Sequence, residues 1–511
     1  MMAAETLHGQ RLGVLLAGLT RIAPMADRVV TGLAVDSRQV RPGGAFVAIA
    51  GTRAHGLDHL DEALQQGAVA VLIDPADRAV ADIHARVAAR DAVVIPVPDL
   101  ARRLGSVAAR FHGEPSAALQ RVYAVTGTDG KTSVSHFLAA MRDRPAAPAG
   151  VLGTLGRGRP GHLEVAGLTT PDAIGLQASL AALVARGCRE VALEASSHGL
   201  DQYRLDGTRI DVAILTQLGR DHLDYHVDEA SYAAAKARLF DWPGLVGVAL
   251  NLDDAFGREL CARVRPQIRR IGYARSGDME APDGTLRARS IQGQADGIRF
   301  RLAWRDQVQP VTLPLLGAFN VDNVLAAAAG LLAAGEDFAS VVASLSRIRP
   351  VPGRMELFRG PDGPGIVVDY AHNAGALRAA LEALRFHARG RIWCIFGAGG
   401  DRDRGKRPLM AAAAAAGADR IILTDDNPRT ESSAAIIADI VAGLPTDADY
   451  TIEPDRERAM QSAFAEAGPD DLLLVAGKGH ETVQIRGDES LPWSDRDAAA
   501  RLVGIDPEGG R

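Results

Sequence analysis

The segment Thr126–Thr132 combines the residue types and the spacing of a phosphate-binding loop. It reads Thr-Gly-Thr-Asp-Gly-Lys-Thr, follows the apolar run Val122–Val125 and precedes a segment with helical character. A glycine-rich turn in front of a helix exposes backbone N–H groups that bind anions. Lys131 would neutralise phosphate charge there, and the Thr132 hydroxyl would bind Mg²⁺. A Gly-Lys-Thr turn also arises by chance, but strand, loop and helix stand here in the order that a nucleotide site needs, so we predict one.

A carboxylate follows another apolar run. Glu194 comes directly after Val191–Leu193 and opens the sequence Glu-Ala-Ser-Ser-His. Mg²⁺ is a hard cation that takes few protein oxygens and keeps waters and phosphates as its other ligands. A carboxylate at a strand end beside a phosphate loop suits this role, so we predict that Glu194 binds Mg²⁺. The alternative is that it caps the following turn.

The segment Arg220–His226 holds two acids and two imidazoles. On a helix, His222 and His226 would share a face. Zinc would fit that spacing, but no third strong ligand is apparent and the phosphate loop favours Mg²⁺; a solvated polar turn is the alternative. Lys236 follows in an Ala-rich helical segment and, taken alone, has the pattern of an ordinary surface lysine.

Three clusters of charged residues and glycines follow apolar runs in the last third of the chain: Gly397–Arg407, Asp425–Arg429 and Gly477–Glu481. Arg binds a carboxylate through two parallel hydrogen bonds, and Asp or Glu can bind an ammonium group. The clusters therefore indicate a substrate that carries both groups. Surface ion pairs are the alternative for any one cluster, but they explain three clusters at strand ends less well.

The elements that must position these residues are buried parallel strands alternating with helices, because continuous short apolar runs alternate with helical segments. The expected strands are Ala45–Ile49, Val69–Ile73, Val93–Val97, Val122–Val125, Val191–Leu193, Val212–Leu215, Val246–Leu250, Ile366–Val368, Ile392–Phe396, Ile421–Leu423 and Leu472–Val475. Ligands bind at the carboxyl ends of such strands. Between Leu286 and Leu313 the residues alternate apolar and polar, which predicts antiparallel hairpins, and Asn320–Gly335 reads as a helix. Ile348–Gly353, with two prolines, reads as a linker between domains.

Length and composition bound the class of protein. The chain has 511 residues, which suggests about three domains. Its hydrophobic fraction of 47% excludes wholesale disorder, and its net charge of −6 gives no overall attraction to nucleic acid or an anionic membrane. No apolar run is long enough to span a membrane. Three scattered cysteines argue against a disulfide framework and for a reducing, cytoplasmic location.

Together these motifs resemble those of the Mur ligases, the ATP-dependent amino-acid-adding enzymes of peptidoglycan synthesis, and above all the members that add meso-diaminopimelate. The resemblance covers nearly the whole chain. Asp36-Ser-Arg38 is similar to the start of the uridine-binding part, and Thr126–Thr132 to the family's TGTNGKT loop. Asp425–Arg429 matches the DNPR signature for diaminopimelate and is the most specific similarity.

The resemblance implies an α/β protein of three domains. These are an N-terminal α/β domain that binds the UDP-linked substrate (1–100), a central P-loop ATPase domain with a parallel sheet (101–348), and a Rossmann-like C-terminal domain that binds the amino acid (349–511). It also implies ATP as a substrate, Mg²⁺, a carbamylated Lys236 and, as we expect, a monomer.

The resemblance to the Mur ligases also implies a role for each matching residue. The catalytic residues would be Lys131, His222, Lys236 and Arg354. ATP would be bound by Thr126, Gly127, Thr128, Asp129, Gly130, Lys131, Thr132, Ser133, Asn323, Arg354 and Asp369. The UDP-linked substrate would be bound by Ser37, Thr169, Thr170, Ser196, Gln202 and Arg204. The amino acid would be bound by Arg402, Asp426, Asn427, Pro428, Arg429, Gly477 and Glu481. The metal would be bound by Thr132, Glu194, His222 and Lys236 as a carbamate.

The reaction that the resemblance implies joins meso-2,6-diaminopimelate to UDP-N-acetylmuramoyl-L-Ala-D-Glu. The D-glutamate γ-carboxylate takes the γ-phosphate of ATP, and the amine then attacks the acyl phosphate. The chain departs from the family pattern at three places: Asp129 and Gln217 each replace a usual Asn, and Asn373-Ala-Gly375 replaces Thr-Pro-Asp.

Two kinds of alternative stay open. One is another amide ligase of the same fold, which adds lysine or D-Ala-D-Ala or extends a folate; Arg429 discriminates, because it suits a second carboxylate and would repel a lysine side chain. The other is a nucleotide-dependent switch or binding protein, which would not need three clusters of Arg, Asp and Glu in its last domain.

Overall fold

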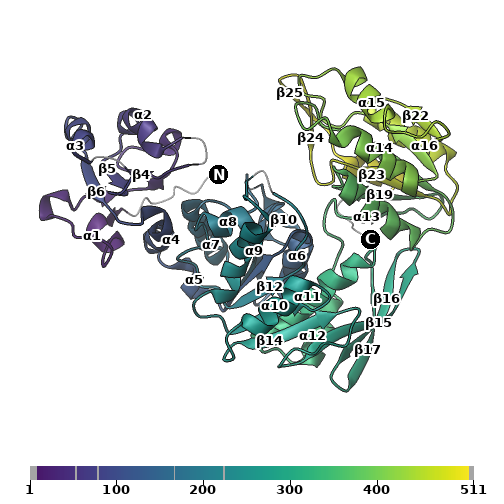
Figure 1. The fold of residues 1–511 in the computed structure, drawn as a ribbon, viewed down its shortest axis with the longest axis horizontal. Coiled ribbons are helices and arrows are strands. Elements are labelled where there is room, and N and C mark those ends of the chain that lie inside the picture. The colour runs from purple at the N-terminus through teal and green to yellow at the C-terminus, as the bar shows by residue number, and fades with distance from the viewer. Residues whose placement is uncertain (1–8, 52–53, 78–79, 166, 223–224, 506–511) are drawn as a thin grey trace. The chain divides into compact units, whose positions relative to one another are not determined.

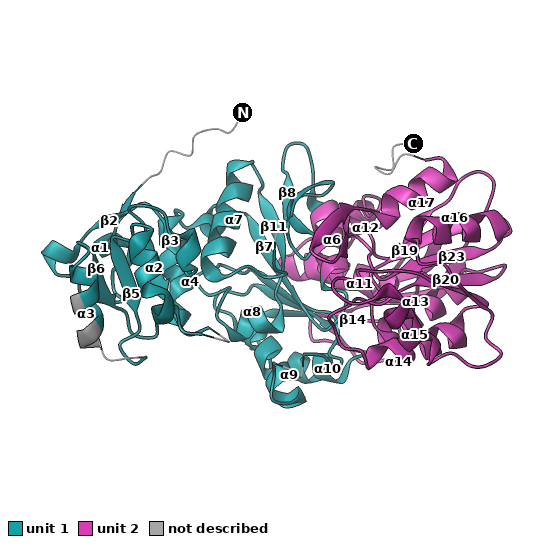
Figure 2. Ribbon diagram, turned by 90° about the horizontal axis from the view of Figure 1, so that it is seen from above, with its two compact units in different colours: residues 1–131, 142–250, 254–270 teal, residues 132–141, 251–253, 271–511 magenta. Residues whose placement is uncertain are grey.

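The protein is described from a computed structural model for residues 9–51, 54–77, 80–165, 167–222 and 225–505 (Figure 1). The chain divides into two compact units (Figure 2). The first comprises residues 1–131, 142–250 and 254–270, and the second residues 132–141, 251–253 and 271–511. The domain limits expected from the sequence, at 100/101 and 348/349, stay predictions.

The N-terminal part of the first unit is a parallel sheet of four strands in the order β3-β4-β5-β6. Phe46 and Val71 pack on one face of this sheet, and Val47 and Leu72 on the other. This alternation along buried strands gives each face an apolar core. Its strands and the small pair beside it are β1 (Gln10–Arg11), β2 (Val29–Val30), β3 (Leu33–Ala34), β4 (Ala45–Ala48), β5 (Ala70–Ile73) and β6 (Val93–Pro96).

The rest of the first unit is a sheet in the order β10-β9-β8-β11-β7-β12-β13, parallel from β8 to β13 and antiparallel at β9 and β10. Its strands are β7 (Arg121–Thr126), β8 (Ala149–Gly153), β9 (Gly156–Arg159), β10 (His162–Glu164), β11 (Glu190–Glu194), β12 (Val212–Leu215) and β13 (Gly247–Asn251). The helices of this unit are α1 (Leu12–Leu15), α2 (Leu60–Gln65), α3 (Val80–Ala88), α4 (Leu100–Phe111), α5 (Pro115–Ala118), α7 (Ala173–Ala185), α8 (Ser197–Asp201), α9 (Glu229–Ala237) and α10 (Ala255–Arg263). Because β7 is flanked by β11 and β12, the residues that follow these three strands meet at one edge.

The second unit begins with α6 (Lys131–Arg142), of which residues 132–141 belong to it, and with strands in the order β14-β15-β16-β17. Strands β15, β16 and β17 pair antiparallel, as the alternating pattern predicted. The elements here are β14 (Arg269–Ala274), β15 (Thr285–Gln294), β16 (Gly297–Trp304), β17 (Gln307–Leu313), α11 (Phe319–Ala334) and α12 (Phe338–Leu345).

The remaining sheet of the second unit has six strands in the order β18-β19-β23-β20-β21-β22, and only β18 is antiparallel to its neighbour. Apolar cores cover both of its faces. Its strands and the hairpin after it are β18 (Glu356–Phe358), β19 (Gly365–Asp369), β20 (Ile392–Phe396), β21 (Arg420–Leu423), β22 (Tyr450–Ile452), β23 (Leu472–Ala476), β24 (Val483–Arg486) and β25 (Glu489–Pro492). Its helices are α13 (Ala374–Arg385), α14 (Lys406–Gly417), α15 (Ser433–Val441), α16 (Arg456–Glu466) and α17 (Asp495–Val503).

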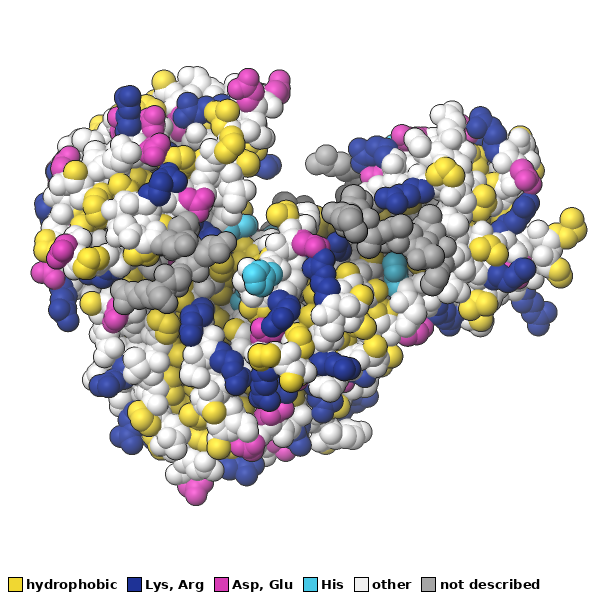
Figure 3. All heavy atoms as spheres, turned by 180° about the vertical axis from the view of Figure 1, so that it is seen from behind, with side chains coloured by type: hydrophobic (Ala, Val, Ile, Leu, Met, Phe, Trp, Pro, Cys, Tyr) yellow, Lys and Arg dark blue, Asp and Glu magenta, His cyan; other side chains and the backbone are white. Residues whose placement is uncertain are grey.

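The eleven apolar runs that predicted strands all form strands, and each end lies within one residue of the expected end. The predicted helix at Asn320–Gly335 is α11, which ends at Ala334 because Gly335 takes a left-handed conformation and caps it. Within the described residues, no helix combines the length and apolar character needed to cross a membrane. The face seen in Figure 3 carries Lys and Arg side chains interspersed with Asp and Glu.

Candidate active site

The phosphate loop lies between β7 and α6, where two glycines have positive φ angles. Gly127 has φ +146° and Gly130 has φ +81°. A Cβ atom at Gly127 would lie 1.8 Å from Oγ1 of Thr216, which follows β12. The loop therefore packs so closely against the neighbouring strand end that only glycine fits.

Lys131 is the first residue of α6 and is half-buried. Its Nζ donates hydrogen bonds to the carbonyl oxygens of Gly127 at 2.9 Å and Thr128 at 2.7 Å. Thr132 and Ser133 are buried in the first helical turn. The side chain of Lys131 thus lies over the loop at the positive end of a helix, where an anion binds well.

Two residues that depart from the family pattern, Asp129 in this loop and Gln217 after β12, contact each other. The side-chain amide of Gln217 donates to Oδ2 of Asp129 at 3.0 Å, and the backbone oxygen of Asp129 accepts from Thr216 Oγ1 at 2.6 Å. The backbone N–H of Thr128 donates to the Gln217 carbonyl at 2.8 Å. The added carboxylate therefore has a hydrogen-bond donor of its own.

Lys236 lies on α9 and is only 1% exposed, so its sequence pattern of a surface lysine is misleading. Its Nζ donates to the carbonyl of Gly127 at 2.8 Å and lies 4.3 Å from the ring centre of Tyr232. Burial, and then the positive charge of Lys131, lower the pKa of Lys236 to about 6. Lys236 is therefore largely a neutral amine at physiological pH.

Tyr232 is a residue of this site that the sequence reasoning missed. Its hydroxyl lies 3.0 Å from Thr128 Oγ1, and burial raises its pKa to about 12. It precedes Lys236 by one helical turn, and that spacing on a predicted helix is the signal that could have identified it.

Glu194 ends β11 and is fully buried. Its carboxylate accepts hydrogen bonds from the backbone N–H of Thr154 at 2.8 Å and from the Thr154 hydroxyl at 3.1 Å. It does not act as the cap of the following turn, because that position is taken by Ser196, whose Oγ accepts from the N–H of Gly199.

Five of the six residues expected to bind the UDP-linked substrate gather around Glu194. The Thr170 hydroxyl donates to the Glu194 carbonyl at 2.7 Å and accepts from the N–H of Ser196. Arg204 donates to the Thr170 carbonyl at 2.8 Å and to Oε1 of Gln202. Thr169 pairs with Thr154 through their hydroxyls at 3.0 Å. Burial lowers the pKa of Arg204.

The sixth residue, Ser37, lies in the N-terminal part of the first unit. It is buried, and its hydroxyl donates to Oε2 of Glu62 at 2.6 Å.

His222 and His226 come together with His198, but not on one helical face. Their ring centres lie 4.8 Å and 5.7 Å from that of His198. His222 has a positive φ of 55°, which no right-handed helix allows, and the neighbouring Leu223 and Asp224 lie outside the described residues. Among the residues that the structure describes, no group of three or more His, Cys, Asp or Glu side chains is arranged to hold a metal ion.

The second unit holds the remaining residues expected to bind ATP. Arg354 lies over the ring of Tyr370, with its guanidinium carbon 4.8 Å from the ring centre. Burial, and then the charge of Arg354, lower the pKa of His136 to about 4; His136 is on α6, the helix that follows the phosphate loop. Burial raises the pKa of Asp369, which accepts from the N–H groups of Met355 and Ala371.

Asn323 lies on α11 and is buried there. Its side-chain nitrogen donates to Oδ1 of Asn320 at 2.9 Å, which fixes its orientation along the helix.

The residues expected to bind the amino acid meet after β20, β21 and β23 of the C-terminal sheet. A Cβ at Gly399 would lie 3.0 Å from Nη1 of Arg429 and 3.6 Å from Cγ of Arg402, so both arginines flank this loop. A Cβ at Gly477 would lie 2.5 Å from Oδ2 of Asp426, so glycine is needed beside that carboxylate. Two cations and one acid thus share this edge of the sheet.

A buried lysine joins the same group. Lys478 is fully buried and its Nζ donates to Asn427 Oδ1 at 2.9 Å and to Glu481 Oε2 at 2.8 Å. The amide of Asn427 donates to the same Glu481 oxygen at 3.0 Å. Pro428 stands between Asn427 and Arg429, and Arg429 has a positive φ of 54°. The Asp-Asn-Pro-Arg segment is therefore joined by hydrogen bonds to the Gly477–Glu481 segment.

These features define a class of protein. It is an enzyme that binds a nucleotide at one parallel sheet and carries a site with both positively and negatively charged side chains at the edge of a second sheet. The chain belongs to the Mur ligase family. Three family models match consecutive segments: the Mur ligase family catalytic domain at residues 29–112, the Mur ligase middle domain at 125–331, and the Mur ligase glutamate ligase domain at 353–479. The predicted class, an α/β protein of three domains, is confirmed.

Close relatives carry one name, UDP-N-acetylmuramoyl-L-alanyl-D-glutamate–2,6-diaminopimelate ligase. The chain is 51% identical to that of Alkalilimnicola ehrlichii, covering 97% of this chain and 99% of the relative. It is 47% identical to that of Xanthomonas campestris pv. campestris, covering 95% and 96%. A solved structure of an enzyme of this name has a TM-score of 0.71 at 33% identity and covers 97% and 99% of the two chains.

Proposed function

We propose that this protein is an ATP-dependent ligase that joins meso-2,6-diaminopimelate to the D-glutamate of UDP-N-acetylmuramoyl-L-Ala-D-Glu. The observation that carries the proposal is the amino-acid site, where Arg402 and Arg429 lie near Asp426 and Glu481, in a chain that has a phosphate loop and close relatives of that name. An amino acid with two carboxylates and two amines fits such a site, because each charge meets its opposite.

In the first step, a γ-carboxylate oxygen of D-glutamate attacks the γ-phosphorus of ATP. A new phosphorus–oxygen bond forms, the bond to the β-phosphate oxygen breaks, and ADP leaves with the electron pair. Catalysis of this transfer is mostly positioning and charge stabilisation. Lys131, whose Nζ lies over the phosphate loop, and Arg354 would supply positive charge.

In the second step, the amine of diaminopimelate attacks the acyl carbon. The tetrahedral intermediate expels inorganic phosphate as the amide forms, and the amine loses its proton. Arg402 and Arg429 would hold a carboxylate, and Asp426 and Glu481 an ammonium group. The bond from Lys478 orients Glu481 before the substrate arrives.

Mg²⁺ fits the oxygen donors present, since it needs few protein ligands and uses phosphates and waters for the rest. The Thr132 hydroxyl and the Glu194 carboxylate are such oxygens, and a buried Thr126 Oγ1 at the end of β7 has no hydrogen-bond partner among the described residues. The ion would be held by Thr132, Glu194, His222 and a carbamate of Lys236. When bound, Mg²⁺ would neutralise the charge of the transferred phosphate.

A carbamate at Lys236 fits its surroundings. An ammonium there would repel both Lys131 and a metal ion, whereas a carbamate is an anion that can pair with them. Thr169, Thr170, Ser196, Gln202 and Arg204 would hold the UDP-linked substrate beside Glu194, and Ser37 its uridine end. ATP as a co-substrate and buried cysteines without a disulfide agree with a reducing cytoplasm, where we expect a monomer.

The test measures phosphate release by the purified protein with ATP, Mg²⁺, the UDP-linked dipeptide and diaminopimelate. The mass of the product is determined by mass spectrometry. We expect release only when all components are present. Release that is independent of any amino acid would favour a plain nucleotidase or switch. Release with D-Ala-D-Ala or with a folate instead would favour another ligase of this fold.

A further inference from the structure

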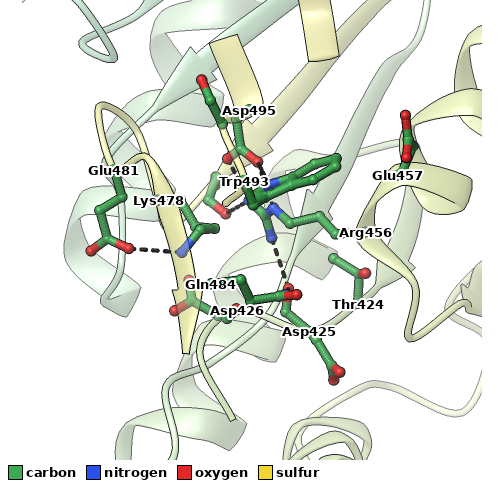
Figure 4. A network of polar contacts seen from close by, with 12 residues as sticks. Thr424, Asp425, Asp426, Arg456, Glu457, Lys478, Glu481, Gln484, Trp493 and Asp495 are labelled. Carbon is green, nitrogen blue, oxygen red and sulfur yellow. Dashed lines mark hydrogen bonds and ion pairs between the residues drawn. The ribbon is translucent and has the colours of Figure 1, made fainter. Parts of the chain in front are cut away.

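We propose that the buried pair Arg456–Asp495, with Gln484, is a positioning group that sets the distance between the two segments carrying the amino-acid-binding residues. This inference rests on the proposed function. Arg456 opens α16 and Asp495 opens α17, and neither is among the residues expected to bind the amino acid. Figure 4 shows the pair together with Asp425, Asp426 and Lys478.

The contacts of Arg456 link two separate segments. Its Nε and Nη2 donate to the two carboxylate oxygens of Asp495, each at 2.7 Å. Nη2 also donates to the carbonyl of Ala476 at 2.9 Å, and Nη1 donates to the carbonyl of Asp425 at 3.3 Å (Figure 4). Ala476 directly precedes Gly477, and Asp425 directly precedes Asp426. One guanidinium group therefore binds the backbone directly before each of the two binding segments.

The sheet cannot make this connection by itself. Asp425 follows β21 and Ala476 ends β23, and these strands are not neighbours, because β20 lies between them. No strand-to-strand hydrogen bond joins them directly. Gln484 on β24 adds to the link, since its Nε2 donates to the Asp426 carbonyl at 2.9 Å.

Because the Arg456–Asp495 pair is buried, we infer that it orients the backbone of the binding segments rather than stabilises the fold. Arg456 and Asp495 side chains are 1% and 0% exposed, and Trp493 Nε1 donates to the same Asp495 at 2.8 Å. Replacing a buried ion pair by apolar residues of similar volume often leaves stability unchanged or raises it. A pair that serves only to fill the core would therefore be replaceable, whereas a pair that directs backbone carbonyls would not.

The experiment compares three variants with the wild type: Arg456→Met/Asp495→Leu, Arg456→Lys and Gln484→Leu. Melting temperature and the KM values for diaminopimelate and ATP are measured for each. We expect the double variant to melt within a few degrees of the wild type, with a KM for diaminopimelate raised about tenfold or more, because small misplacements are costly in a positioned site. We expect the KM for ATP to change less than about twofold. Arg456→Lys keeps a cation opposite Asp495 and should show the same split, and Gln484→Leu a smaller one.

The matched control is Asp471→Ala at the opposite edge of the same sheet. Asp471 is buried and accepts from Trp393 Nε1 at 3.1 Å and from the N–H of Arg391 at 2.7 Å, at the amino ends of β20 and β23. The Asp471→Ala variant should have a lower melting temperature than the wild type and an unchanged KM for diaminopimelate.

Wild-type KM values in the folded variants would overturn the proposal. So would equal rises for both substrates, or a rise in the control. If neither Arg456 variant folds, Gln484→Leu decides in the same way. A wild-type protein that does not use diaminopimelate would instead contradict the proposed function, before any variant is compared.

Discussion

Replacing Lys236 by Met should stabilise the protein while inactivating it. The wild-type lysine is buried and its pKa is lowered from 10.5 to about 6, chiefly by burial. The unfolded chain therefore binds the proton more tightly between these values, so wild-type stability rises with pH from about 6 to 10.5 and falls as the pH is lowered. At pH 7, which is about 3.5 units below the pKa of a lysine in the unfolded chain, the amine must lose its proton to be buried. This deprotonation costs about 5 kcal/mol as an upper value. Methionine carries no such cost, although it loses the bond to the Gly127 carbonyl.

The assay is chemical denaturation in CO2-free buffer across pH 6–10, with and without added bicarbonate. We expect Lys236→Met to be more stable by about 2–4 kcal/mol near pH 7, since the lost hydrogen bond offsets about 1 kcal/mol of the gain. Bicarbonate should stabilise the wild type alone, because a group that binds only to the folded state raises stability by mass action. Isotope-labelled bicarbonate should give a carbamate signal by carbon NMR in the wild type. A destabilised variant, or bicarbonate effects equal in both proteins, would refute the reasoning.

Other variants test the remaining parts of the site. Lys131→Ala should lower the rate of ATP-dependent ligation by about 10²–10³ and leave the fold intact; near-normal turnover would contradict its role at the phosphates. Arg429→Ala should raise the KM for diaminopimelate by about 10–10² and spare that for ATP, because a charged hydrogen bond is worth about 1.5–3 kcal/mol; steady-state kinetics decide. Gly127→Ala should lower the melting temperature and abolish nucleotide binding, because its Cβ would lie 1.8 Å from Thr216 Oγ1; unchanged calorimetry would contradict this.

The sequence alone predicted eleven of the strands, because buried parallel strands appear as continuous apolar runs and each run here forms a strand. It missed other strands of the same sheets, among them β8, β14 and β22. The phosphate loop and the Asp-Asn-Pro-Arg segment were also recognisable, since each is a local motif that follows a strand. The roles assigned to their residues stay predictions.

What could not be predicted depends on contacts between distant residues. Nothing in the Ala-rich surroundings of Lys236 shows that its helix faces the phosphate loop, so its burial and its lowered pKa were hidden. The expected helical face of His222 and His226 was wrong, because a positive φ at His222 breaks the helix that the spacing suggested. The pairing of Arg456 with Asp495 joins two helix starts that no local pattern connects.

The most direct test of the central claim offers the wild-type protein an equal mixture of meso-diaminopimelate and L-lysine, with ATP, Mg²⁺ and the UDP-linked dipeptide. The masses of the products are then compared. Arg429 is half-buried, and its Nη1 donates to the Gly400 carbonyl at 2.8 Å. L-lysine has no distal carboxylate, so it would leave the Arg429 guanidinium without a carboxylate partner. We predict that the diaminopimelate product exceeds the lysine product by about 10² or more. Equal amounts, or an excess of the lysine product, would contradict the account.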